Sequence, residues 1–254
     1  MTISLVRSSP ASAATGRPTA GGRFLLFHLW LPLLLALAAS AVLMGVGVDR
    51  WLADWLFRAE GGHWVLKDAW LTSTLIHRGG KTASTLAGLA VIALCAWSWR
   101  RPAWRTYRRP LLYLALAGAA STLLVSVLKS LIHMDCPWDL ARYGGTREFI
   151  GLLQSRPASM PASQCFPAGH ASAGYAWVAL YFAALAACPR WRWIGLDIGL
   201  GAGMLFGISQ QLRGAHFLSH DVWTLATCWL VALGLYLLML RPRPATTVTP
   251  GETA

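Results

Sequence analysis

Apolar residues fill long stretches of this chain, and short segments rich in arginine separate them. Within each stretch the apolar residues run continuously instead of alternating with polar ones, which is typical of helices and not of barrel strands. A helix that crosses a bilayer needs about 20 mostly apolar residues. The pattern therefore predicts six membrane-spanning helices, at residues 24–46, 84–99, 111–132, 171–187, 194–208 and 221–240.

Two further features of the N-terminal half affect this count. Residues 52–75 carry several tryptophans among charged residues, and we interpret them as an amphipathic segment that lies at the membrane interface without crossing it. The apolar run that begins at Phe24 is longer than the roughly 7 to 15 residues of a signal-peptide core. We therefore expect an uncleaved first span.

The basic residues are distributed unequally between the two sides of the predicted bundle. Arginines concentrate before the first span, between the second and third, between the fourth and fifth, and after the sixth. Most acidic residues fall in the other connections, so the positive-inside rule places the arginine-rich side in the cytoplasm. Both termini then lie in the cytoplasm. We expect a polar, disordered tail at residues 1–23, one membrane domain at residues 24–240 and a second tail at residues 241–254.

Composition agrees with a membrane protein and argues against two other classes. Of the 254 residues, 56% are hydrophobic and 13% are charged, whereas an average soluble domain has about 25% charged residues. The formal net charge of +12 would suit a nucleic-acid-binding protein. However, the bases sit at the ends of apolar spans and form no continuous basic face. We therefore expect membrane lipids as partners and no nucleic acid.

The five cysteines divide by depth. Three of them, Cys95, Cys188 and Cys228, lie in or at the ends of predicted spans, where a thiol is an ordinary packing residue. The other two, Cys136 and Cys165, share the long outer loop, which would face the oxidising side of a bacterial inner membrane. A disulfide between them is compatible with the sequence, but the sequence does not show whether it forms.

Polar residues of catalytic types gather in three segments on the predicted outer side. Residues 129–147 end the third span and begin the loop after it, residues 165–172 open the fourth span, and residues 209–221 join the fifth span to the sixth. Two histidines in these segments, His170 and His216, offer a nucleophile and a general acid near neutral pH. The pattern predicts an active site at this face of the membrane.

The same segments suit an anionic substrate such as a phosphate. The backbone N–H groups of Ala168 and Gly169 open a predicted helix, where free N–H groups and the helix dipole favour an anion. Side chains that would add charge-assisted hydrogen bonds are Lys129, Arg142, Arg147 and Arg213. Phosphoryl transfer through a phosphohistidine then needs no metal ion or other cofactor, because the basic groups stabilise the transferred charge.

These residues resemble the three motifs of the type 2 phosphatidic acid phosphatase (PAP2) superfamily, whose membrane members have six spans. The motifs read Lys-x6-Arg-Pro, Pro-Ser-Gly-His and Ser-Arg-x5-His-x3-Asp. The positions that match are Lys129, Pro137, Pro167, Gly169, His170, Ser209 and His216. The positions that depart are Cys136 and Gln210 in place of arginine, Ala168 in place of serine, and His220 in place of aspartate.

The resemblance implies a role for three of the matching residues. Lys129 would bind phosphate, His170 would protonate the leaving group, and His216 would attack phosphorus. The residue that orients His216 stays open between His220 and Asp221, although a carboxylate is electrostatically better because it stabilises an imidazolium.

Other arginines are placed to compensate for the two that the motifs lack. Arg213 follows position 210 by one helical turn, so on a helix it shares the face of the missing guanidinium. Arg142 or Arg147 would serve the first motif in the same way. Whether this compensation occurs decides whether the chain is active or is a relative that keeps the fold alone.

The predicted protein is thus an all-α, six-transmembrane-helix bundle with a periplasm-facing active site. Its predicted activity is that of a lipid phosphomonoesterase or pyrophosphatase in a bacterial inner membrane. The family suggests undecaprenyl diphosphate, phosphatidylglycerol phosphate, phosphatidic acid and the 1-phosphate of lipid A as substrates, among which the sequence does not choose. A lipid phosphotransferase and a non-catalytic lipid-binding or transport protein are the alternatives, and the oligomeric state stays open.

Overall fold

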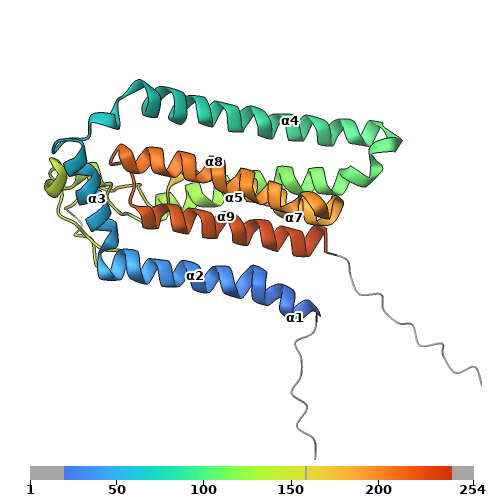
Figure 1. Cartoon of the computed structure of the whole chain (residues 1–254), viewed down its shortest axis with the longest axis horizontal. Helices are drawn as coiled ribbons and strands as arrows, with labels where there is room; N and C mark the ends of the chain where they lie inside the picture. The colour runs from blue at the N-terminus through green and yellow to red at the C-terminus, as the bar shows by residue number, and fades with distance from the viewer. Residues whose placement is uncertain (1–19, 158, 242–254) are drawn as a thin grey trace, which may run out of the picture.

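The computed structural model describes residues 20–157 and 159–241, which form an all-helical bundle (Figure 1). Most of the two predicted tails, residues 1–19 and 242–254, lies outside the described residues. The first long helix begins at Ala20, a few residues before the predicted span. It comprises α1 (Ala20–Leu25), the π-helical turn η1 (Leu26–Trp30), α2 (Leu31–Ser40) and the π-helical turn η2 (Ala41–Val46).

A short amphipathic helix follows the first long helix. Gly47 has φ of 92°, a left-handed conformation that glycine adopts without strain, and it separates η2 from α3 (Val48–Ala59). Within α3, Trp51 and Trp55 are exposed, whereas Asp49 and Ala53 are buried. The side chain of Asp49 accepts a hydrogen bond from the backbone N–H of Ser219 at 3.0 Å, which satisfies a free N–H in the first turn of α9 (Leu218–Met239).

The second long helix corrects the prediction for residues 52–75, which do not form one interfacial segment. After the turn η3 (Val65–Lys67), the π-helical segment η4 (Trp70–Gly79) runs directly into α4 (Gly80–Arg100). This helix therefore begins well before residue 84. The polar residues of η4 suggested an interface in the sequence, but Thr72 is buried and His77 is half-buried against other helices.

The remaining helices lie close to the predicted positions. The third is α5 (Arg108–Leu131), preceded by η5 (Pro102–Tyr107), and the long loop after it holds η6 (Pro137–Asp139) and η7 (Ala141–Tyr143). The fourth is continuous through α6 (Gly169–Tyr175), η8 (Ala176–Val178) and α7 (Ala179–Ala187). After η9 (Pro189–Trp191) come α8 (Arg192–Leu212) and α9.

Four segments of the described chain are long and apolar enough to cross a membrane. They are Gly21–Val46, Val65–Arg100, Pro102–Leu131 and Leu218–Met239. The α6–α7 helix and α8 do not meet that standard, so the six predicted spans are not all borne out. These two helices bury glycines and polar side chains such as Ser172 and Gln210 inside the bundle, where polar residues of membrane helices normally lie.

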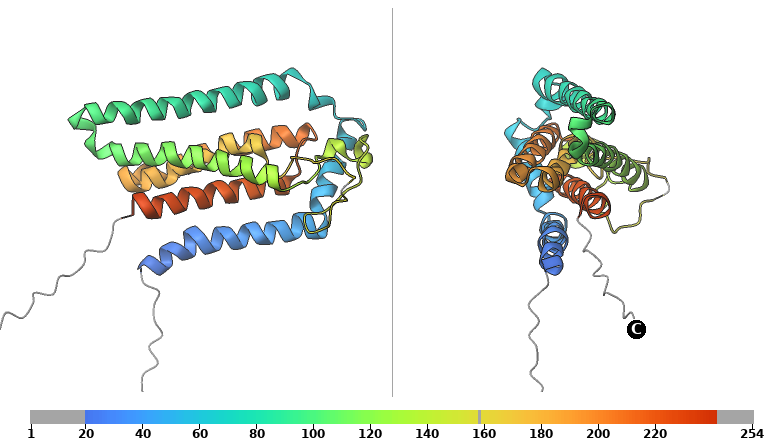
Figure 2. Two further views of the ribbon diagram at one scale, coloured as in Figure 1. Left: turned by 180° about the vertical axis from the view of Figure 1, so that it is seen from behind. Right: turned by 90° about the vertical axis from the view of Figure 1, so that its right-hand side faces the viewer.

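The connections between helices sort to the two ends of the bundle. The start of α1, the α4–α5 and α7–α8 connections and the end of α9 lie at one end (Figures 1 and 2). The other end carries α3, the long loop between α5 and α6, and the α8–α9 connection. The arginine-rich connections therefore share one end, and the three catalytic-type segments share the opposite end.

The core lies between α5, the α6–α7 helix and α9, around Tyr113, Val125, Val178 and Phe182. The Tyr113 hydroxyl donates a hydrogen bond to the backbone carbonyl of Ala232 at 2.9 Å. Helix α8 packs on this unit through glycines, as the spacing of Gly195, Gly199 and Gly203 suggests. A Cβ on any of these three would collide with α6–α7, so close helix approach depends on the absence of a side chain there.

Candidate active site

Backbone hydrogen bonds join the three catalytic-type segments at the end of the bundle. The Trp138 N–H donates to the Gly214 carbonyl at 2.9 Å, which links the first segment to the third. The Cys165 N–H donates to the Met134 carbonyl at 3.2 Å, which links the second to the first. The Ala168 N–H donates to the His220 carbonyl at 3.3 Å. The sequence therefore folds these distant segments into one unit.

A cavity of about 640 Å³ opens between α4, α5 and α6. Its lining changes character along these helices. At the end nearest the catalytic-type segments it presents Lys129, His170, His77 and Lys81. Along α4 and α5 it continues past hydroxyl and small residues to apolar side chains such as Leu89 and Ile92. The cavity thus joins a cationic head to an apolar groove.

Lys129 and His170, which were both predicted site residues, line the cavity at its cationic head. A Cβ on Gly169 would lie 3.2 Å from the Lys129 Nζ, so the glycine leaves room for the ammonium group beside the first turn of α6. The Nε2 atom of His170 is enclosed and has no hydrogen-bond partner among the described residues. The Ala168 N–H, which the sequence offered as a phosphate donor, is instead directed at the His220 carbonyl.

His77 of η4 joins this group, although it lies outside the three segments that the sequence analysis identified. Its ring packs against the His170 ring with the centroids 4.1 Å apart. The Gln210 side-chain amide lies 2.6 Å from His77 Nδ1. Arg213 in turn donates to Gln210 Oε1 at 3.2 Å and to the Lys67 carbonyl at 2.7 Å. Arg213 therefore contacts Gln210 but does not line the cavity, and its role as a phosphate-binding residue stays a prediction.

His216 occupies the buried loop between α8 and α9, and it does not line the main cavity. Burial lowers the pKa of His216 well below its usual value, and the neighbouring His220 and the charge of Lys129 act in the same direction. The Nδ1 atoms of His216 and His220 are 3.3 Å apart. The ring is therefore neutral at physiological pH, with His220 as its side-chain partner.

Asp221, the electrostatically preferred partner for His216, lies on a different face of α9. Its carboxylate accepts a hydrogen bond from Gln211 Nε2 at 2.6 Å and abuts Gly207 of α8. The reason is geometric: consecutive helical residues point about 100° apart, so 220 and 221 do not share a face. The structure brings His220, and not Asp221, to His216.

The two arginines of the long loop, Arg142 and Arg147, are engaged in ion pairs. Arg142 holds Asp54 of α3 at 2.5 Å, and this hydrogen bond keeps the pKa of Asp54 below its usual value. Arg147 pairs with Asp135 at 2.6 Å, alongside Arg156 at 2.8 Å. Burial raises the pKa of Asp135, but the two guanidiniums outweigh it and lower the pKa overall. Neither arginine lines the cavity.

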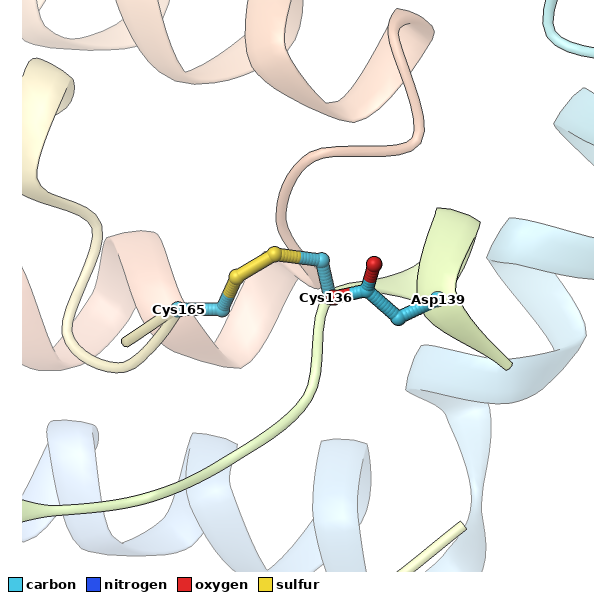
Figure 3. A group of neighbouring side chains, drawn as sticks. All are labelled: Cys136, Asp139 and Cys165. Carbon is cyan, nitrogen blue, oxygen red and sulfur yellow. A yellow bond between two sulfur atoms is a disulfide. The ribbon is translucent and has the colours of Figure 1, made fainter. Parts of the chain in front are cut away.

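Cys136 and Cys165 form a disulfide, with their Cα atoms 5.3 Å apart (Figure 3). The bond fastens the first catalytic-type segment to the second, at the position where the family motif has arginine. With Asp139 these sulfurs form the group of potential metal ligands found among the described residues. Because the two sulfurs are bonded to each other, neither is a thiolate, so this group does not suit a metal ion.

Sequence reasoning missed His77 and Lys81 as members of the site. A signal was present: His77, Lys81, Ser84 and Gly88 follow one another at helical spacing and all line the cavity. A polar stripe that runs into an apolar helix marks a functional face more often than an interface. The prediction that this helix begins near residue 84 hid the stripe.

The chain forms an apolar helical bundle with a cavity at one end that is lined by lysine and histidine side chains. These features indicate a membrane protein, and comparison with known proteins agrees with that class. A model of the PAP2 superfamily matches residues 110–247, more than half of the chain. The chain belongs to the PAP2 superfamily. It is a membrane protein whose matched region contains Lys129, His170 and His216.

The fold is also similar to that of a solved structure. The crystal structure of a transmembrane PAP2-type phosphatidylglycerolphosphate phosphatase from Bacillus subtilis aligns with a TM-score of 0.51 and 16% sequence identity. The alignment covers 84% of this chain and 94% of that chain. At this identity the likeness is one of fold alone. No curated protein matches the chain.

Proposed function

We propose that this protein is an integral-membrane phosphatase that hydrolyses a lipid phosphate or diphosphate through a phosphohistidine intermediate. The observation that carries the proposal is the two-part cavity. Its cationic head suits a phosphate, and its groove suits the chain of a lipid. From His77 to Ile92 the cavity follows one helix for about 22 Å at 1.5 Å per residue, which is long enough to hold much of an acyl chain.

The groove is placed to receive a chain from the bilayer. Leu89 and Ile92 line it, and each is more than half exposed. A lipid whose headgroup enters at the catalytic end would keep its apolar part in hydrocarbon. This arrangement supports a lipid phosphate over a soluble one, and the proposed substrates are those the family suggests, with none of them preferred.

The proposed reaction has two steps. A nitrogen of His216 attacks phosphorus and forms an N–P bond, while the bond to the lipid oxygen breaks and His170 donates a proton to that oxygen. Water then attacks the phosphohistidine, gives its proton to His170 and releases inorganic phosphate. Lys129 stabilises the charge on the transferred phosphoryl group, so the chemistry requires no metal ion. For attack, the free ring nitrogen of His216 must be accessible to the phosphoryl group bound at Lys129.

His220 would set the proton on His216 before attack. The two facing Nδ1 atoms are close enough for one to donate to the other. If His216 donates, its Nε2 carries a free lone pair and is the nucleophile. A neutral imidazole orients the ring in this way, but it stabilises the imidazolium less than the carboxylate of the family motif would.

The proposed orientation places the catalytic end in the periplasm of a bacterial inner membrane and both termini in the cytoplasm. The grouping of arginine-rich connections at the opposite end supports it. The α6–α7 helix and α8 complete the proposed six-helix membrane domain.

The test is phosphate release from a panel of lipid phosphates by the detergent-purified chain. We expect release by the wild-type protein and by His63→Ala, a control in which an exposed histidine is lost. We expect His216→Ala and His170→Ala to lose nearly all activity. Release that is unchanged in His216→Ala would contradict the proposed mechanism.

A phosphotransferase is the second candidate, since it shares the first step. A lipid hydroxyl would replace water as the acceptor in the second step. The same assay with labelled phosphate separates the two, because a transferase yields a labelled lipid in place of free phosphate.

A further inference from the structure

Position 210 carries the third-motif arginine in the family and a glutamine in this chain. The Gln210 side chain contacts both His77 and Arg213. Arg213 donates to Gln210 Oε1, so the other end of the amide, Nε2, faces His77 Nδ1 at 2.6 Å. The reverse orientation of the amide would set two N–H donors against each other. Arg213 therefore fixes the direction in which Gln210 acts.

This contact also fixes the proton on His77. Because Gln210 Nε2 is a donor, His77 Nδ1 must accept, and the neutral ring carries its hydrogen on Nε2. His77 Nε2 has no hydrogen-bond partner among the described residues, and the residue lines the cavity beside His170 and Lys129. The chain from Lys67 through Arg213 and Gln210 thus presents an oriented N–H donor at the cationic head.

We propose that His77 is a phosphate-binding residue of this site and that it replaces the guanidinium missing from position 210. Gln210 is its positioning residue. Lys81 lies one helical turn further along the same face and adds a positive charge at the same end of the cavity. The inference rests on the proposed function for its substrate, a lipid phosphate, but the ligand it needs is the phosphate group alone.

The arrangement accounts for two observations at once. The chain lacks both motif arginines, and it places on its second long helix a histidine and a lysine that belong to no motif. A shift of phosphate-binding groups from the third motif to η4 and α4 explains why His77 of η4 packs against His170.

The test uses the full chain in detergent with inorganic phosphate as the probe. His77→Asn keeps a group that can face Gln210 but lacks a donor at the Nε2 position, whereas His77→Gln places an amide N–H near that position. We expect His77→Asn to weaken phosphate binding roughly 10- to 100-fold, as expected for one hydrogen bond to a charged group, and His77→Gln to weaken it less. His63→Ala is the matched control and should bind as the wild type does.

A second measurement on the wild-type protein guards against a variant that fails to fold. Diethyl pyrocarbonate modifies accessible imidazole nitrogens, and mass spectrometry locates the adducts. We expect phosphate to protect His77 and to leave His63 unprotected. Equal modification of His77 with and without phosphate would overturn the inference, as would wild-type phosphate affinity in His77→Asn.

These outcomes separate the inference from the proposed function. Phosphate binding that depends on His77, without release from any lipid, would support the inference and contradict the proposed phosphatase. Lipid hydrolysis with an unchanged KM and kcat in His77→Asn would do the reverse. A wild-type protein that neither binds phosphate nor hydrolyses a lipid would overturn both.

Discussion

His216 is enclosed by protein on every side, and this burial controls its proton. An imidazolium in a desolvated site is costly, so burial lowers the pKa of His216 well below the usual value near 6.5. His220, Lys129 and His170 are the charged or titratable groups that act on it, and all oppose protonation. As the proposed nucleophile, a neutral His216 keeps its lone pair available below neutral pH.

The lowered pKa predicts how stability depends on pH. Between the pKa of folded His216 and about 6.5, the unfolded chain binds a proton that the folded chain does not. Stability from this residue is therefore present well above pH 6.5 and is lost as the pH falls, by about 1 kcal/mol between pH 6.5 and 5.5. Thermal unfolding of wild type and His216→Gln at pH 7.5 and 5.5 measures this contribution.

The expected result is a smaller loss of stability on acidification in His216→Gln than in the wild type. The other histidines remain in both proteins, so the difference between the two losses isolates residue 216. Equal losses would show that His216 is as easily protonated in the folded protein as in the unfolded chain.

Helix α8 packs closely against the α6–α7 helix. A Cβ on Gly199 would collide with the backbone of Val178, whereas a Cβ on Gly201, two residues away, would meet nothing within 4 Å. The two glycines share a helix and differ in the face they occupy. They therefore separate close packing from helix propensity.

We predict opposite effects of the same substitution at these two glycines. Gly199→Ala should lower the free energy of unfolding by about 1–3 kcal/mol, because two backbones must move apart. Gly201→Ala should be neutral or stabilising by up to about 1 kcal/mol, because alanine favours a helix over glycine. Thermal unfolding in detergent compares them. Similar destabilisation by both would contradict the close α7–α8 packing.

The disulfide constrains the long loop between α5 and α6. It closes a loop with a sequence separation of 29 residues, for which chain entropy gives a stabilisation of about 3–4 kcal/mol. We predict that dithiothreitol lowers the unfolding temperature of the wild type but not of the Cys136→Ser, Cys165→Ser double variant, which should already be less stable. A wild type indifferent to the reductant would show that the bond contributes little.

Hydrophobic pattern predicted the existence and approximate bounds of the long helices, because each needs an apolar face in a bilayer or a bundle. It failed at η4, where Thr72 and His77 turn inward and satisfy their polarity within the protein. Helix pattern reports the polarity of residues, but it does not report which face a neighbour will cover. Helix α8 is not apolar enough to be identified as a span by itself, because its glycine and amide residues pack against other helices.

For the whole molecule, the sequence motifs predicted that Lys129, His170 and His216 lie at one end. The structure adds the partners of the side chains there, which spacing along the sequence does not reveal. Partners such as Asp54 for Arg142 and Asp135 for Arg147 come from segments distant in sequence, so those arginines seemed free. The choice between His220 and Asp221 depends on the rotation of α9, which a motif does not encode.

The molecule also separates its two ends by charge and chemistry. Arginine-rich connections lie at one end of the bundle, and α3 and the long loop between α5 and α6, which carries the disulfide, lie at the other. This separation is what a membrane enzyme with one active face requires, since its substrate headgroup reaches the protein from one side only.

The central proposal is that phosphate passes to His216 from a lipid whose headgroup is bound at the cationic head of the cavity. Its most direct test is to mix the purified protein with a lipid carrying labelled phosphate, quench within one turnover, and locate the label by mass spectrometry. We predict a phosphohistidine at residue 216 that is absent from His216→Ala. Label on His170 or His77, or release of phosphate without any labelled protein, would contradict the claim.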